Sequence, residues 1–153
     1  MTGLYILILE LPHPTTITTR RRAFALDAGF YAYVGSAMNG LEARIARHQS
    51  PDKKRHWHID YLLDHAAVRS VLSAETNADA ECLLAGRLSD LPAVAGFGCS
   101  DCRCRSHLFF SPDLIDLTSR ATGAFRAAGL DPRTMSIGDT HRYDRDAQSS
   151  RSC

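Results

Sequence analysis

The chain has 153 residues, of which 44% are hydrophobic and 23% charged, and its formal net charge is +1. This length favours one domain with a hydrophobic core, and the composition argues against a disordered chain. No apolar run approaches the roughly 20 residues that span a bilayer. We therefore expect no membrane partner and a cytoplasmic location.

The first third of the chain predicts strands followed by a helix. Residues 3–11 are almost wholly apolar, which is typical of a strand covered on both faces. The β-branched stretch 15–19 and the alternating stretch 22–26 indicate two further strands, and 30–34 indicates another. A helix is predicted over 41–48, after the turn residues that precede it.

The remaining elements alternate between helices and short strands. A helix is predicted over 57–65 and a strand over 68–73. Asn77 is a suitable N-cap for a helix that extends to Leu88. A short strand is predicted over 108–110, and Asp113 is expected to cap an amphipathic helix.

These elements predict an α+β fold with a small, mostly antiparallel sheet flanked by helices. We expect the main domain to span residues 1–111 and an amphipathic C-terminal helix to span 112–129. Apolar residues become sparse after this helix, so a disordered tail is expected over 130–153.

Several polar residues that could take part in binding or catalysis lie in the stretch YAYVGSAMNGLEARIARH, residues 31–48. Arg44 and His48 are four residues apart and share one face of the predicted helix. Local clusters of lysine and arginine occur despite the near-neutral total, so a polyanion such as nucleic acid is a candidate partner. Solvated loops remain the alternative explanation of these clusters.

Two short motifs resemble the paired signatures of the GIY-YIG nuclease superfamily: Gly3-Leu4-Tyr5 on the first strand and Tyr33-Val34-Gly35 on a later one. The blocks YVGSAMNGLEARIARH, KKRHWHIDYLL, AEC and GFGCSDCRCRSHLFF narrow the resemblance to domain of unknown function 123. That family is regarded as a GIY-YIG relative, and its members occur alone or fused to an endonuclease III-type glycosylase. A long insert separates the two motifs here, whereas GIY-YIG domains usually have a short hairpin.

The resemblance implies catalytic roles for Tyr5, Tyr33, Arg44 and His48, and a metal-binding role for Glu81. Arg44 would contact a non-bridging phosphate oxygen, and Tyr5 would orient or deprotonate the attacking water. Tyr33 would support Tyr5 or the phosphate.

Further roles follow for the glycines and the metal. Gly3 and Gly35 would shape structural turns that allow close backbone approach. The ion at Glu81 would be Mg²⁺ or Mn²⁺, because oxygen ligands suit hard cations. His48 would carry a proton or donate to the phosphate.

A second polar group follows the helix with Arg44. Lys53 and Lys54 are candidates for contacts with backbone phosphates, and His58 and Asp60 are candidates for substrate contact or support of the site. Packing of the predicted helix, with His58 bonded to Asp60 or to a loop, explains the same pattern equally well.

The loop CSDCRCRSH contains Cys99, Cys102, Cys104 and His107, which could bind zinc with tetrahedral geometry. One short loop would have to supply all four ligands, and this spacing is shorter than in an ordinary zinc ribbon. We therefore regard zinc as the less favoured cofactor. The favoured interpretation is a structured loop at the active face, formed by Asp101, Cys102, Cys104 and His107, with His107 assisting the chemistry.

The leading hypothesis is a metal-dependent phosphodiesterase or endonuclease of GIY-YIG type that acts on nucleic acid, with DNA favoured over RNA. One alternative is a non-catalytic nucleic-acid-binding module associated with DNA repair, linked functionally to an endonuclease III-type glycosylase. A second alternative is a zinc-binding structural or interaction protein. Joint presence of Tyr5, Tyr33, Arg44 and Glu81 favours the enzyme.

Overall fold

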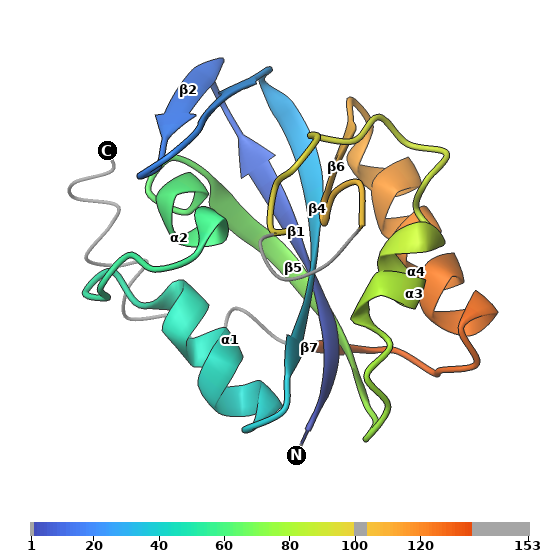
Figure 1. Cartoon of the computed structure of the whole chain (residues 1–153). Coiled ribbons are helices and arrows are strands. Elements are labelled where there is room, and N and C mark those ends of the chain that lie inside the picture. Colours follow the sequence, from blue (N-terminus) through green and yellow to red (C-terminus); the bar gives the residue numbers. More distant parts are fainter. Residues whose placement is uncertain (1, 100–103, 136–153) are drawn as a thin grey trace.

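The computed structural model describes residues 2–99 and 104–135, and a five-stranded antiparallel sheet forms its centre (Figure 1). The strands are β1 (Gly3–Leu11), β4 (Gly29–Ala37), β5 (Ala67–Glu75), β6 (Leu108–Ser111) and β7 (Arg133–Met135), in the spatial order β6-β4-β1-β5-β7. The predicted α+β fold with a mostly antiparallel sheet is confirmed.

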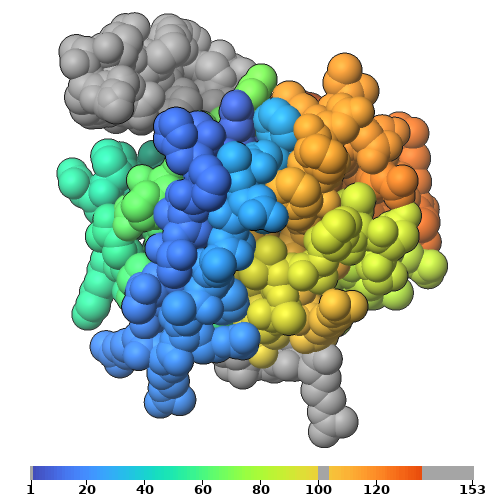
Figure 2. All heavy atoms as spheres, turned by 90° about the horizontal axis from the view of Figure 1, so that it is seen from above, coloured from blue at the N-terminus to red at the C-terminus, as the bar shows by residue number. Residues whose placement is uncertain are grey.

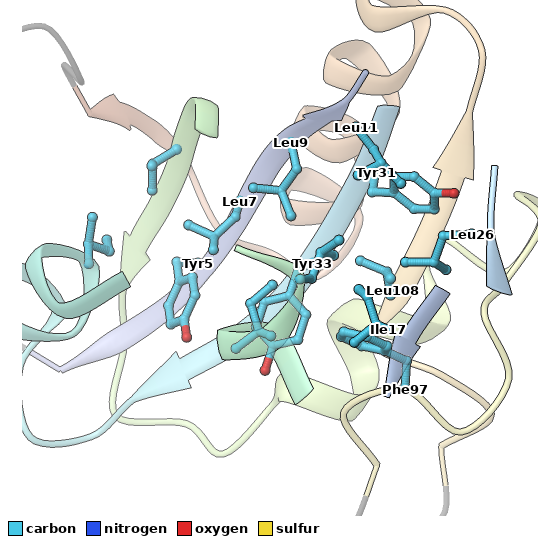
Figure 3. Packing of buried hydrophobic residues seen from close by; sticks show 14 of the residues in the cluster. Tyr5, Leu7, Leu9, Leu11, Ile17, Leu26, Tyr31, Tyr33, Phe97 and Leu108 are labelled. Atoms are coloured by element: carbon cyan, nitrogen blue, oxygen red, sulfur yellow. The ribbon is translucent and has the colours of Figure 1, made fainter. Parts of the chain in front are cut away.

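The central strand β1 is buried on both faces because it pairs with β4 on one side and β5 on the other. Since side chains alternate along a strand, Leu4 and Ile6 enter one core while Tyr5 and Leu7 enter the other. Figure 3 shows the second row, which runs along β1 from Tyr5 to Leu11. The apolar residues of this strand therefore contribute to two hydrophobic cores, one on each face of the sheet.

Two pairs of helices cover the two faces of the sheet (Figure 1). The helices α1 (Leu41–Gln49) and α2 (His58–Leu62) pack on the face that carries Tyr5. The helices α3 (Glu81–Gly86) and α4 (Leu114–Ala127) pack on the opposite face. Within the ranges 2–99 and 104–135, no helix combines the length and apolar character needed to cross a membrane.

The long insert between the two sequence motifs folds as a separate hairpin. Its strands β2 (Thr15–Thr18) and β3 (Ala23–Leu26) pair with each other in a two-stranded sheet. The inward residues Ile17 and Phe24 join the core on the Tyr5 face. In Figure 2, this blue hairpin region lies between the green segment that holds α2 and the orange segment that holds α4.

The cap of α4 agrees with the sequence, whereas the start of α3 does not. The Asp113 side chain accepts hydrogen bonds from the backbone N–H groups of Ile115 and Asp116, as predicted for an N-cap. Asn77 does not cap α3, which begins at Glu81. The side chain of Asn77 instead accepts a 3.1 Å hydrogen bond from the hydroxyl of Thr2, beside the start of β1.

The C-terminal segment contributes a strand where the sequence predicted a disordered tail from residue 130. Arg133–Met135 forms β7 and pairs with Val71–Ser73 of β5. The physical reason is that β5 has an edge opposite β1 whose N–H and C=O groups accept another strand. Residues 136–153 of the predicted tail lie outside the described residues.

The strand β4 extends past the end of its neighbour β6, and this offset creates an open sheet edge. Pairing between β4 and β6 covers Phe30–Tyr33, and the Val34 N–H then donates to the His107 carbonyl. Beyond Val34, the pairing of β4 in the described chain is with β1 alone. Side chains from both faces of the sheet can therefore meet around residues 35–37.

Gly35 lies at this edge, opposite Tyr5 on β1. A Cβ atom at residue 35 would lie 2.9 Å from Tyr5 Cε1 and closer still to its Cζ and hydroxyl. The absence of a side chain therefore lets the Tyr5 ring lie directly over the backbone of β4. At Gly3, a Cβ would overlap the Ala74 carbonyl, so that glycine permits close pairing with β5.

We expect Gly35→Ala to lower the free energy of unfolding by about 1–3 kcal/mol, because the buried Tyr5 ring must move. Gly123→Ala in α4 is the matched control, since a Cβ there meets nothing within 4 Å. This control should stabilise the chain by up to about 1 kcal/mol. Urea unfolding of both variants measures the difference. Equal stability of the two variants would contradict the prediction.

Candidate functional site

A pocket of about 600 Å³ lies at the open edge of β4. It is lined by Tyr5, Tyr33, Gly35, Ser36, Arg44, His56, Trp57, His58, Asp79, Glu81, Cys82, Gly98 and His107. These residues come from β1, β4, α1, α2, α3 and the loops before α2, α3 and β6. The cavity is therefore bordered by four of the five residues predicted to act in catalysis or metal binding: Tyr5, Tyr33, Arg44 and Glu81.

Tyr5 and His48 form a buried pair behind the pocket wall. The Tyr5 hydroxyl lies 2.7 Å from His48 Nε2, and the two residues are only 1% and 2% exposed. Burial lowers the pKa of His48 to about 3. Burial also raises the pKa of Tyr5 well above 10, although the positive charge of Arg44 acts to lower it. Both groups are therefore uncharged at neutral pH, and the hydrogen bond joins a neutral phenol to a neutral imidazole.

Tyr33 lies beside Tyr5 on the neighbouring strand. The two ring centroids are 6.5 Å apart, and Figure 3 shows both hydroxyls pointing in the same direction. Burial raises the pKa of Tyr33, with further contributions from Tyr5 and Glu81. Neither phenol is therefore poised to lose its proton at neutral pH. Tyr31, on the same strand, instead donates to the backbone carbonyl of Asp27.

Arg44 reaches the pocket from α1, and its guanidinium is held by a hydrogen bond and by a contact with an aromatic ring. Its Nη1 donates a 3.0 Å hydrogen bond to the Ser36 carbonyl. Its Cζ lies 4.5 Å from the centroid of the Trp57 ring, which is within the range of a cation–π contact. The side chain is thus oriented before any ligand binds.

Arg47, one turn away from Arg44, holds Asp60 in a structural role. Its guanidinium forms two hydrogen bonds to the Asp60 carboxylate, of 2.8 and 3.1 Å, and also contacts Trp57. Asp60 is fully buried and accepts from the backbone N–H groups of His56 and Trp57. Burial acts to raise its pKa, but these hydrogen bonds outweigh burial and lower it.

Four described residues that the sequence predicted as contacts lie outside the pocket lining: Lys53, Lys54, Asp60 and Cys104. Lys53 Nζ donates to the backbone carbonyls of His48 and Ser50, which holds the end of α1 in place. The Lys54 side chain is exposed. Asp60 and Lys53 therefore position the loop that carries Trp57, and they do not face the cavity.

Glu81 is the carboxylate at the pocket wall, and a hydroxyl donor and an imidazole nitrogen lie beside it. Its Oε1 accepts from the Ser36 hydroxyl at 2.7 Å, and its Oε2 lies 2.8 Å from His107 Nδ1. Burial opposes ionisation, but these contacts from His107 and Ser36 lower the pKa of Glu81. The side chain is 25% exposed, so an ionised oxygen pair borders the cavity.

A sulfur–imidazole group adjoins Glu81. Cys82, Cys104 and His107 have donor atoms that all lie within 4.8 Å of one another, and this group could bind a metal ion. The sulfur atoms of Cys82 and Cys104 lie in disulfide contact. The zinc hypothesis from the sequence included Cys104 and His107 but placed Cys99 in the set. Cys99 Sγ instead donates to the Phe97 carbonyl at 3.4 Å.

The loop before β6 is fixed against α2 through His58. The Gly98 N–H donates to His58 Nδ1 at 2.9 Å, and Gly98 has a φ of 75°, in the left-handed region that favours glycine. Burial lowers the pKa of His58. His58 therefore lines the pocket as an acceptor that orders the loop. The predicted loop residues Asp101 and Cys102 lie outside the described residues.

Sequence reasoning missed four lining residues that bear on the chemistry: Ser36, Trp57, Asp79 and Cys82. Trp57 is the first residue of the helix predicted over 57–65, and its contact with Arg44 has no signal in the spacing. Cys82 directly follows Glu81, and this adjacency was the available signal. Asp79 precedes α3 by two positions and shares the loop that brings Glu81 to the wall.

We expect His48 to make the chain less stable in mild acid. The unfolded state takes up a proton on this imidazole near pH 6.5, whereas the folded state resists protonation down to about pH 3. Stability therefore falls as pH decreases, by about 2 kcal/mol between pH 7 and pH 5. Denaturant unfolding of wild type and His48→Gln measures this contribution.

The variant His48→Gln should lose that part of the pH dependence while keeping an acceptor for Tyr5. His65→Gln, at a solvent-exposed position, is the matched control and should behave as wild type. An unchanged pH profile in His48→Gln would show that the imidazole does not resist protonation in the folded state.

Comparison with known proteins gives one result. The family model described as Domain of unknown function DUF123 matches residues 4–130, which is well over half of the chain. No curated protein and no solved structure matches the chain. The matched range includes the strand–turn–helix with Arg44, the helix with Glu81 and the loop before β6. The chain therefore belongs to the DUF123 family, whose function is unknown.

Proposed function

We propose that this chain hydrolyses phosphodiester bonds in nucleic acid with a divalent metal ion, as GIY-YIG nucleases do. The observation that carries the proposal is the convergence of Tyr5, Tyr33, Arg44 and Glu81 on one pocket. They come from β1, β4, α1 and α3, far apart in the chain. The motifs that resemble the GIY-YIG signatures are those that supply the two tyrosines.

Arg44 is the residue suited to bind the scissile phosphate. One of its five N–H donors is used by the Ser36 carbonyl, and its plane is held by Trp57. A fixed guanidinium can donate two parallel hydrogen bonds to non-bridging phosphate oxygens, where negative charge increases in the transition state. Prior orientation reduces the ordering that substrate binding would otherwise require.

The donor groups at the pocket wall fit a hard divalent cation. Glu81 presents an ionised carboxylate, and Asp79 supplies a second carboxylate to the lining. Oxygen donors of this kind suit Mg²⁺ or Mn²⁺, with water and phosphate completing the coordination shell. When bound, such an ion acts as a Lewis acid and polarises a water molecule.

Tyr5 is better suited to orient the attacking water than to deprotonate it. The sequence left both roles open, and the raised pKa of this phenol favours the first. In the His48 tautomer that has its lone pair on Nε2, Tyr5 donates its proton to His48, and the Tyr5 oxygen can accept a hydrogen bond from a water in the pocket. His48 thus sets the direction of the Tyr5 hydroxyl and does not itself touch the substrate.

Nucleic acid is the substrate class that best fits the surroundings. The segment from Lys53 to Arg55 directly precedes the lining residues His56 and Trp57. Within it, the exposed Lys54 can contact backbone phosphates on either side of the scissile one. We favour DNA over RNA because of the resemblance described above.

The test is cleavage of nicked, branched and single-stranded DNA and of RNA in Mg²⁺ or Mn²⁺. Glu81→Gln keeps the shape but removes the charge, and we expect it to lower the cleavage rate by about 100-fold or more. Arg44→Lys should also lower the rate by roughly 100-fold, because lysine lacks the planar fork. Both variants should unfold at denaturant concentrations close to that of wild type.

The matched control is Glu75→Gln, at an exposed position outside the pocket lining, which should cleave as wild type does. Absence of cleavage by wild type on all substrates would overturn the nuclease proposal. Tight, salt-dependent binding without cleavage would instead identify a non-catalytic nucleic-acid-binding module.

A further inference from the structure

We propose that Cys82, Cys104 and His107 bind a zinc ion at the pocket wall, at a site separate from the Mg²⁺ or Mn²⁺ proposed at Glu81. The three residues come together from two parts of the chain. Cys82 is the second residue of α3, and the other two precede β6. An ion here would join the loop before β6 to the helix that carries Glu81.

The spacing between His107 Nε2 and Cys82 Sγ is close to what tetrahedral zinc requires. Zinc binds sulfur at about 2.3 Å and imidazole nitrogen at about 2.0–2.1 Å, which places the donor atoms roughly 3.5–3.8 Å apart. His107 Nε2 lies 3.9 Å from Cys82 Sγ, and all three donor atoms lie within 4.8 Å of one another. The two sulfurs lie in disulfide contact, so they must be reduced and move apart before both can reach coordination distance.

The contact between Glu81 and His107 orients the imidazole for this role. Glu81 Oε2 lies 2.8 Å from His107 Nδ1, so the tautomer that donates to Glu81 has the lone pair on Nε2. Nε2 is the nitrogen that faces the sulfur of Cys82. A carboxylate behind a histidine is the usual arrangement around a zinc ligand, because it fixes the ring and increases its basicity.

The backbone holds His107 rigidly in this position. Its N–H donates to the Phe97 carbonyl and its carbonyl accepts from the Val34 N–H, both at 2.9 Å. The side chain is only 2% exposed, so it has little room to turn away from the sulfurs. A site with preset ligands loses less conformational entropy when the ion binds.

The donor set selects zinc over the hard ions. Two thiolates and one imidazole are soft or borderline ligands, whereas Mg²⁺ prefers oxygen. The disulfide must first take up two electrons and two protons from a thiol reductant, which is itself oxidised to a disulfide. Binding of Zn²⁺ to the two thiols then releases two protons and forms two zinc–sulfur bonds. The fourth tetrahedral position belongs to a ligand that is not among these three residues.

A disulfide between Cys82 and Cys104 is the competing state, and it is the state of the two sulfurs in this structure. The two states exclude each other, since disulfide sulfurs are not thiolates. The carboxylate-backed imidazole beside the sulfurs favours the metal, because a disulfide makes no use of that orientation.

The test is the metal and thiol content of the full chain purified under reducing conditions without chelator. We expect about one zinc ion per wild-type chain, and at least a tenfold lower content in Cys82→Ser and in His107→Gln. Cys99→Ser is the matched control and should keep its zinc. Glu81→Gln should bind zinc about 10–100-fold more weakly, because only the support of His107 is lost.

A second measurement decides the matter if the cysteine variant does not fold. Replacement of zinc by Co²⁺ in the wild-type chain should give the thiolate-to-cobalt absorption of a tetrahedral site. Absence of this band, or a zinc-free chain with Cys82 and Cys104 oxidised, would overturn the proposal. So would loss of zinc from Cys99→Ser to the same extent. No measurement here involves nucleic acid, so failure of the nuclease proposal leaves the zinc proposal intact.

Discussion

The position of α1 depends on the contact of the Tyr5 ring with the backbone of β4 at Gly35. Because residue 35 has no side chain, the Tyr5 hydroxyl can extend across β4 to His48 Nε2. That hydrogen bond ties the last turn of α1 to the central strand of the sheet. Arg44 lies one turn earlier on the same helix, so its distance from the sheet edge is fixed by the same contact.

The open edge of β4 explains how opposite charges from two layers meet in one cavity. Ser36 is central to this, because its carbonyl accepts from Arg44 and its hydroxyl donates to Glu81. Arg44 comes from the helix on one face, and Glu81 comes from the helix on the other. Had β6 continued along β4, its backbone would have occupied this edge and separated the two side chains. The early end of β6 is therefore part of the site.

The sequence predicted the layered fold, since the spacing of apolar residues along a strand or helix determines the buried face. Tyr5, Tyr33 and Arg44 were predicted from the resemblance to GIY-YIG nucleases, whose motifs lie on these regular elements. It did not predict the structural role of Asp60, which depends on hydrogen bonds to backbone N–H groups of a folded loop. Cys82 was missed because its partner Cys104 is 22 residues away, beyond the reach of a local motif.

Glu81 would serve both proposed ions, and its geometry allows this. Each carboxylate oxygen can accept more than one contact, so the contacts with Ser36 and His107 leave acceptor positions on both oxygens. Charge also permits it, since a zinc ion with two thiolates and a neutral imidazole has no net charge. Such a site would not repel a second cation, and Glu81 would keep its own negative charge. The zinc site would therefore act by holding Glu81 in place, and loss of zinc should loosen the carboxylate without neutralising it.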